Sequence, residues 1–181
     1  MKVIIIGNAP VKQEFGCLVD EFEYIIRINK FESGHQKHTG SKTNILAIGG
    51  LNPIGSYIGT IWGMFPAHSY DELFKQAKKK YGANLVKFDK DHIKMLQTHL
   101  KYPFHSVFST TGLTTIYMAL KVFHSPIYTL GFELDGNKDY ENIFGEKCKL
   151  KKLEYHNLLK ERKYYDWLIQ KGDVIELRNI V

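Results

Sequence analysis

The stretch that decides the fold is Val3-Ile4-Ile5-Ile6-Gly7-Asn8-Ala9-Pro10. Its four consecutive β-branched residues suit a strand buried on both faces, as strands of parallel sheets are. The strand stops at Gly7-Asn8, which tolerates unusual backbone angles, and Pro10 fixes the turn that follows. A polar turn after a buried strand is a common place for phosphate or a nucleotide to bind, but it also suits an ordinary core strand with an ordinary turn.

Length and composition predict a single globular domain over residues 1–181. The chain has 181 residues, of which 44% are hydrophobic, enough for a sizeable core. No apolar run approaches the roughly 18 residues of a membrane span, and Met1-Lys2 leads into the first strand without a signal-peptide pattern. With only Cys17 and Cys148, a disulfide framework is not expected, and the cytoplasm is the expected compartment.

The net charge of +6 favours an anionic ligand or surface. The excess lies in residues 75–94 and 147–163, where lysines alternate with apolar residues as they do on solvated helix faces. No nucleic-acid-binding motif is present, so nucleic acid is not an expected partner. The sequence leaves open a peripheral contact with the inner face of a membrane through residues 75–94.

Hydrophobic patterning alternates strands with helices. Strands are expected at residues 3–6, 23–29, 43–48, 84–88, 126–130 and 173–177. Helices are expected at residues 69–81, 91–100, 113–123 and 155–171, the first with Ser69 and Glu72 in a capping-box pattern. Residues 51–67 are expected to form a loop whose aromatic side chains make either a lid or acceptor platform, or a small cluster beneath the loop. This order predicts one Rossmann-like α/β sheet with flanking helices.

Two of the expected strands end in asparagine, at Asn8 and Asn29. If these strands are parallel neighbours, both side chains lie at one carboxyl edge of the sheet. An amide there can donate to a phosphate oxygen or accept from a sugar hydroxyl. The alternative is that each asparagine only closes its own turn.

Thr110-Thr111-Gly112 stands directly before an apolar helix. Such a helix start offers unpaired backbone N–H groups and a positive dipole end, which together bind anions, although simple N-capping explains the same residues. Gly131-Phe132 ends another expected strand, and the ring could pack on a base or ribose at that edge.

Glu161 falls on the core face of the last helix and needs a polar partner there. His156 precedes it by five residues and is the side-chain type best suited to take a proton near neutral pH, although a lone histidine is more often structural. His35 and His38 share a polar loop with Glu32, but these residues do not give the two histidines a third ligand at metal-site spacing. No metal is therefore expected.

Taken in order, these residues resemble the sialyl motifs of the sialyltransferases of glycosyltransferase family 29. The large motif resembles Ile6-Gly7-Asn8, Gly16, Asp20, Arg27-Ile28-Asn29 and Gly40-Ser41-Lys42-Thr43. The small motif resembles Thr110-Thr111-Gly112, Ala119-Leu120 and Gly131-Phe132. The very small motif resembles His156 and Glu161, which have four residues between them.

The resemblance implies the metal-independent GT-A variant fold, with CMP-sialic acid or a closely related CMP-activated sugar acid as donor. The acceptor would be a hydroxyl of a glycan or glycolipid, and no metal or other cofactor would be needed. Direct attack would invert the anomeric centre, with His156 as the catalytic base and Glu161 supporting its helix or the site. The donor would be held by Gly7, Asn8 and Asn29 at phosphate and ribose, by Thr110, Thr111 and Gly112 at the cytidine part, and by Phe132 along base and ribose.

The chain departs from the family pattern in three ways that matter, one of which is its shortness, since 181 residues leave little room for the acceptor loops of the family. Val3 and Phe123 stand where the family disulfide would be, which fits a cytoplasmic microbial protein. The third motif would fall near Lys138-Asp139-Tyr140-Glu141, and its histidine is missing. The alternative function is therefore a CMP-nucleotide-binding protein of the same fold without transferase activity. A nicotinamide-dependent oxidoreductase is disfavoured because Ile6-Gly7-Asn8-Ala9-Pro10 lacks the G-x-G-x-x-G pattern.

Overall fold

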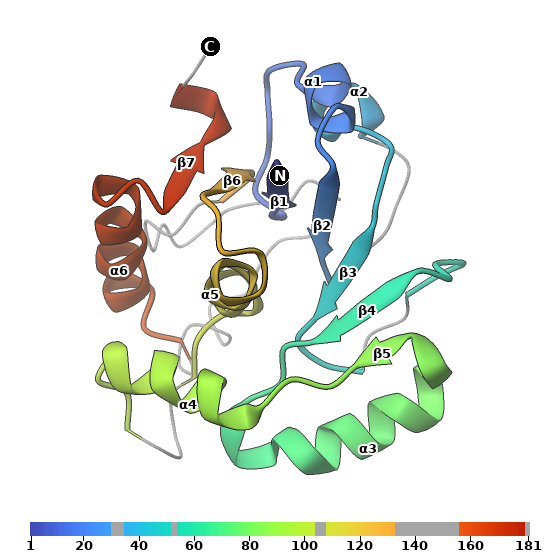
Figure 1. Cartoon of the computed structure of the whole chain (residues 1–181), viewed down its shortest axis with the longest axis vertical. Coiled ribbons are helices and arrows are strands. Elements are labelled where there is room, and N and C mark those ends of the chain that lie inside the picture. Colours follow the sequence, from blue (N-terminus) through green and yellow to red (C-terminus); the bar gives the residue numbers. More distant parts are fainter. Residues whose placement is uncertain (30–34, 52–53, 104–107, 133–155, 180–181) are drawn as a thin grey trace.

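A computed structural model describes residues 1–29, 35–51, 54–103, 108–132 and 156–179. Within them, one seven-stranded sheet has the order β5-β4-β3-β2-β1-β6-β7, and every neighbouring pair is parallel (Figure 1). The strands are β1 (Val3–Ile6), β2 (Tyr24–Ile28), β3 (Ile45–Ile48), β4 (Thr60–Gly63), β5 (Leu85–Val86), β6 (Ile127–Leu130) and β7 (Val174–Glu176). The predicted Rossmann-like fold class is confirmed.

Helices cover both faces of the sheet, which is why the central strands are apolar on both sides. The helices are α1 (Gly16–Asp20), α2 (Gln36–Thr39), α3 (Tyr70–Tyr81), α4 (Lys90–His99), α5 (Thr111–Phe123) and α6 (Leu158–Gln170). On one face, Val3 and Ile5 of β1 pack in a core with α4, α5 and α6. On the other face, Ile4 and Ile6 pack with α1, while α3 covers β3, β4 and β5.

The strand order reverses at β1, which is the reason this strand is central to the site. The chain builds β2 to β5 on one side of β1 and then returns to place β6 and β7 on the other. Ile6 pairs with Arg27 of β2 and with Leu130 of β6, so the three strands end together at one edge. In open α/β sheets, ligands bind in the crevice outside the carboxyl ends of the strands at such a switch point.

The structure corrects the prediction of a loop over residues 51–67. Residues 60–63 form β4, with Leu46 paired to Ile61 and Ala47 paired to Trp62. Only Thr60, Ile61 and Trp62 stand between Gly59 and Gly63, and three residues are too few to show a strand pattern in the sequence. The aromatic residues of this segment belong to the core, since Trp62 is 4% exposed and Phe65 is fully buried. They therefore form neither a lid nor an exposed acceptor platform.

Two predicted helix starts also differ from the structure. Ser69 precedes α3, but its side chain makes no capping hydrogen bond, because it ends a 3₁₀ turn over Ala67–Ser69 (η1) and its backbone is not extended. The last helix begins at Leu158, so His156 lies before the helix rather than in it. A short helix, α2, stands in the polar loop where none was expected.

Among the described helices, none combines the length and apolar composition that crossing a membrane would require. Cys17 is an exposed free thiol, while Cys148 lies outside the described residues. The 75–94 segment forms parts of α3 and α4 together with β5, and its lysines are mainly exposed, as expected for solvated helix faces. Its contact with a membrane stays a prediction.

Gly7 permits a close approach between the ends of β1 and β6. Its N–H donates to Leu130 O at 2.8 Å, and the Ala9 N–H donates to Gly131 O at 2.9 Å. A Cβ placed on Gly7 would overlap the carbonyl oxygen of Gly131, which is backbone and cannot swing away. Gly131 has a φ of 71°, a conformation that side chains other than glycine rarely adopt.

We therefore expect Gly7→Ala to lower the free energy of unfolding by about 3 kcal/mol, because the two strand ends must separate to admit the methyl group. Gly172→Ala is the matched control, since Gly172 has a φ of 76° but nothing lies within 4 Å of its added Cβ. That variant should lose only about 1 kcal/mol, the cost of left-handed backbone alone. Urea denaturation measures both, and equal losses would contradict the close approach.

Candidate active site

The ends of β1, β2 and β3 place two asparagine side chains at the carboxyl edge. Asn29 has a φ of 61°, its N–H donates to Ala47 O at 2.7 Å, and its Oδ1 accepts from Gly49 N at 2.9 Å. Its carbonyl oxygen is thus used within the fold, which leaves the Nδ2 hydrogens for a ligand. The Asn8 side chain is half-buried and makes no hydrogen bond to any other described residue.

The start of α5 meets the same edge of the sheet. Thr110 is the N-cap, and its hydroxyl accepts from Leu113 N at 3.2 Å. The backbone N–H groups of Thr111 and Gly112 have no acceptor in the described part of the chain. A Cβ on Gly49 would overlap the Thr111 side chain, so the helix start lies directly against the end of β3. These two N–H groups and the positive helix end suit an anionic ligand.

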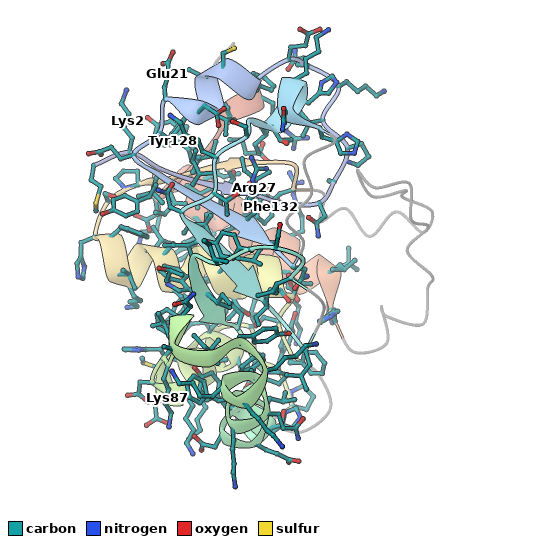
Figure 2. The ribbon with its side chains drawn as sticks, turned by 90° about the vertical axis from the view of Figure 1, so that its right-hand side faces the viewer. Lys2, Glu21, Arg27, Lys87, Tyr128 and Phe132 are labelled. Carbon is teal, nitrogen blue, oxygen red and sulfur yellow. The ribbon has the colours of Figure 1, made fainter. Side chains whose placement is uncertain are left out.

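The Phe132 ring fills the space between the β1 turn and the start of α5. A Cβ would stand 3.2 Å from its Cδ2 at Gly7 and 2.9 Å from its Cε1 at Gly112, so both glycines make room for the ring. The ring is 8% exposed and stacks on Tyr165 with centroids 6.0 Å apart. In Figure 2, Phe132, which follows β6, lies away from Lys2, which precedes β1, because the two residues stand at opposite ends of neighbouring parallel strands. Phe132 therefore fixes the spacing between the β1 turn and the start of α5, while its contact with a base or ribose stays a prediction.

Glu161 joins the first turn of α6 to the start of α5. The side chain is fully buried, and Thr110 donates to it twice, from N to Oε1 at 3.0 Å and from Oγ1 to Oε2 at 2.6 Å. Burial raises the pKa of Glu161 to about 7, and the hydrogen bonds from Thr110 and Tyr102 only partly oppose this rise. The partner that the sequence required for this core-facing carboxylate is therefore Thr110, together with Tyr102.

Tyr102 can satisfy Glu161 in both protonation states. Its hydroxyl has one proton and two acceptors, the carbonyl oxygen of Asn157 at 3.0 Å and Glu161 Oε1 at 3.3 Å. When Glu161 is ionised, Tyr102 can donate to the carboxylate. When Glu161 is protonated, the carboxyl can donate to the Tyr102 oxygen while Tyr102 donates to Asn157. Burial and the neighbouring carboxylate raise the pKa of Tyr102, so it remains a phenol.

His156 stands immediately before Asn157, the N-cap of α6. Its Nδ1 lies 2.7 Å from the carbonyl oxygen of Phe108. A carbonyl only accepts, so Nδ1 carries the proton and Nε2 of the neutral ring keeps its lone pair. The ring also packs edge-on against the Phe108 ring, with centroids 5.0 Å apart at 86°. The half-buried histidine is therefore oriented with one basic nitrogen.

The remaining large-motif residues hold the fold rather than the site. Arg27 is 7% exposed, and its Nη2 donates to the carbonyl oxygens of Thr39 and Gly40 at 2.8 and 2.7 Å. Asp20 accepts from the backbone N–H and the hydroxyl of Ser41. These bonds fold residues 39–43 back onto α1 and β2, so the motif keeps β2 and its terminal Asn29 in place.

The structure brings most of the sequence-predicted site residues together. Phe132 contacts both the β1 turn and the start of α5, and Glu161 connects that start to the helix that His156 precedes. Sequence reasoning missed Tyr102, for which the sequence held no signal, and Gly49, which the Gly49-Gly50 pair after the third strand could have indicated. Residues 138–141, where the third motif was sought, lie outside the described residues.

Within the ranges that the structure describes, no three histidine, cysteine or acidic side chains gather as a metal site. The expectation that no metal is required stays a prediction.

No protein-family model matches the chain by sequence, and neither does any curated protein. Solved structures do match it, over nearly its whole length. A mammalian sialyltransferase superposes with a TM-score of 0.71 at 15% identity, covering 97% of this chain and 68% of its own. The sialyltransferase CstII from Campylobacter jejuni, in complex with cytidine-5'-monophosphate, gives 0.62 at 17% identity, covering 98% and 80%. The resemblance to sialyltransferases is thereby confirmed at the level of the fold.

The raised pKa of Glu161 predicts a pH-dependent stability. The folded chain holds this proton up to about pH 7, whereas the unfolded chain releases it near 4.5, so stability falls as pH rises through that window. The decline should approach about 1.4 kcal/mol per pH unit and total about 3 kcal/mol. Glu161→Gln keeps an oxygen for Thr110 and donates to Tyr102, so it should remove this slope.

Urea denaturation of the two proteins at pH 5, 6, 7 and 8 gives the difference curve, in which the other titrating groups cancel. The native chain should lose stability relative to Glu161→Gln as pH rises. Parallel curves would show that Glu161 does not carry a raised pKa.

Proposed function

We propose that this chain transfers sialic acid, or a related CMP-activated sugar acid, from its CMP donor to a glycan hydroxyl with inversion at the anomeric carbon. The carrying observation is the convergence of anion-binding and proton-accepting groups at the switch point of the sheet. Asn8, Asn29 and the start of α5 supply the first kind of group, and His156 supplies the second. The likeness in fold to sialyltransferases supports the same function.

On the donor side, the described groups suit a phosphate. The N–H groups of Thr111 and Gly112 and the Nδ2 of Asn29 are held by the fold before any ligand arrives, and the Asn8 amide, which makes no hydrogen bond to another described residue, lies on the neighbouring turn. Fixed donors stabilise the charge that grows on a departing phosphate without reorganising. Thr110 has its N–H and hydroxyl engaged with Glu161, so we assign it to holding the helix start and assign direct contact to its two successors.

On the acceptor side, His156 is suited to act as the general base. Nε2 takes the proton of the acceptor hydroxyl while that oxygen bonds to the anomeric carbon and the bond to the CMP phosphate breaks. CMP leaves as a phosphate monoester that carries the released electron pair. Attack from the side opposite to CMP inverts the centre. A positioned base of this kind contributes about 10²–10⁴-fold to the rate.

A site built for CMP should be recognised by ligand-induced stabilisation. We expect CMP at a hundred times its Kd to add about 2.7 kcal/mol to the free energy of unfolding, because it binds only the folded chain. A thermal-shift panel of CMP, CDP, UDP, GDP and NAD measures this. Stabilisation by NAD without stabilisation by CMP would contradict the proposed donor.

His156→Gln tests the base. The glutamine amide can still donate to the Phe108 carbonyl but offers no basic nitrogen, so transfer from CMP-sialic acid should fall about 10²–10⁴-fold while CMP binding persists. His99→Gln, an exposed position on α4, is the control and should keep the native rate. Normal transfer by His156→Gln would refute the assignment. CMP binding without CMP release by the native chain would favour a nucleotide-binding protein instead.

A further inference from the structure

His68 is an exposed histidine held at the same edge of the sheet as the proposed site. It lies in the 3₁₀ turn η1, which follows the carboxyl end of β4. Its neighbours on either side are anchored, since Ala67 is 6% and Tyr70 is 1% exposed, and the Tyr70 hydroxyl accepts from Phe88 N at 2.8 Å. Helix α4 also packs against this turn. The backbone therefore presents the imidazole to solvent from a fixed position.

The Phe108 ring connects His68 to His156. The centroids of His68 and Phe108 are 6.1 Å apart at 51°, and those of Phe108 and His156 are 5.0 Å apart at 86°. The two imidazoles arrive from separate parts of the fold, one after β4 and the other before α6. Together with the half-buried phenyl ring they make one continuous patch of three rings.

The place of this patch argues for the acceptor rather than the donor. The groups assigned to the CMP donor lie on the turns after β1 and β2 and at the start of α5. His68 reaches the site through Phe108 and His156, and the base must touch the acceptor hydroxyl that it deprotonates. A group beside the base is therefore placed to touch the rest of the acceptor sugar.

The chemistry of the patch also suits a sugar. An imidazole offers both a hydrogen-bond donor and an acceptor, which matches the hydroxyl groups of a pyranose. A phenyl ring can pack on the apolar C–H face of the same ring. We propose that His68 and Phe108 form an acceptor subsite that binds the hydroxyl-rich sugar next to the attacking hydroxyl. This inference rests on the proposed transferase function and adds a residue that sets acceptor affinity.

His68→Asn tests the subsite. Asparagine has no polar atom where Nε2 of the imidazole stands, so the KM for the acceptor should rise about three- to tenfold, the usual effect of losing one hydrogen bond. The KM for CMP-sialic acid and the slow release of CMP to water should stay unchanged, because the donor groups are intact. The probes are lactose and Gal-β-1,3-GalNAc-ortho-nitrophenol, with CMP-sialic acid as donor.

His124→Asn is the matched control. His124 is exposed at the C-cap of α5, with a φ of 50° that asparagine tolerates, and the helix separates it from the site by about 20 Å. It should leave every rate unchanged.

An unchanged acceptor KM in His68→Asn would overturn the subsite. A loss of CMP release to water as large as the loss of transfer would also overturn it, because that result would place His68 on the donor side. So would the absence of product from both glycans with the native chain. If the native chain neither binds CMP nor releases it, the proposed function fails, and the subsite fails with it. The CMP thermal shift separates that outcome from the others.

Discussion

The buried carboxylate of Glu161 is the contact on which the candidate site depends. It accepts hydrogen bonds from the backbone N–H and the hydroxyl of Thr110, and so fixes where α5 begins relative to α6. That contact holds the N-terminal, positive end of α5 beside the first turn of α6. His156 stands directly before Asn157, the N-cap of the helix that carries Glu161. Glu161 therefore links the start of α5, where we propose that the donor phosphate binds, to the helix that follows His156, the proposed base.

Burying the Glu161 carboxyl costs free energy, and hydrogen bonds rather than a cation offset that cost. No described salt bridge involves Glu161, and burial is the main influence on its pKa. A buried carboxyl without a positive partner is tolerated when its oxygens are satisfied in each protonation state. Thr110 and Tyr102 provide that. Functional sites commonly accept such local costs because they must hold polar groups in place before a ligand arrives.

Most of the fold could be predicted from the sequence because its signals are local. The apolar run of β1, the glycine after it and the helical spacing of α5 each determine their own element. β4 was not predicted because the three residues between Gly59 and Gly63 show no pattern, and its place depends on pairing with β3. The site was predictable in part. Asn8, Asn29 and His156 were recognised by type and order, whereas Tyr102, Phe108 and His68 matter through contacts that form only after folding.

The Phe132 ring ties three distant positions into one steric unit. Its edges lie against the places where Gly7 and Gly112 lack a side chain, and its face lies against Tyr165. A side chain at Gly112 could be accepted only with a smaller residue at position 132, whereas a side chain at Gly7 would also meet the Gly131 carbonyl oxygen, which no change at position 132 relieves. Shrinking the ring would leave a hole beside both turns. Among chains related to this one, substitutions at these positions should therefore occur together. Their joint substitution would mark where the proposed donor side of the edge had been reshaped.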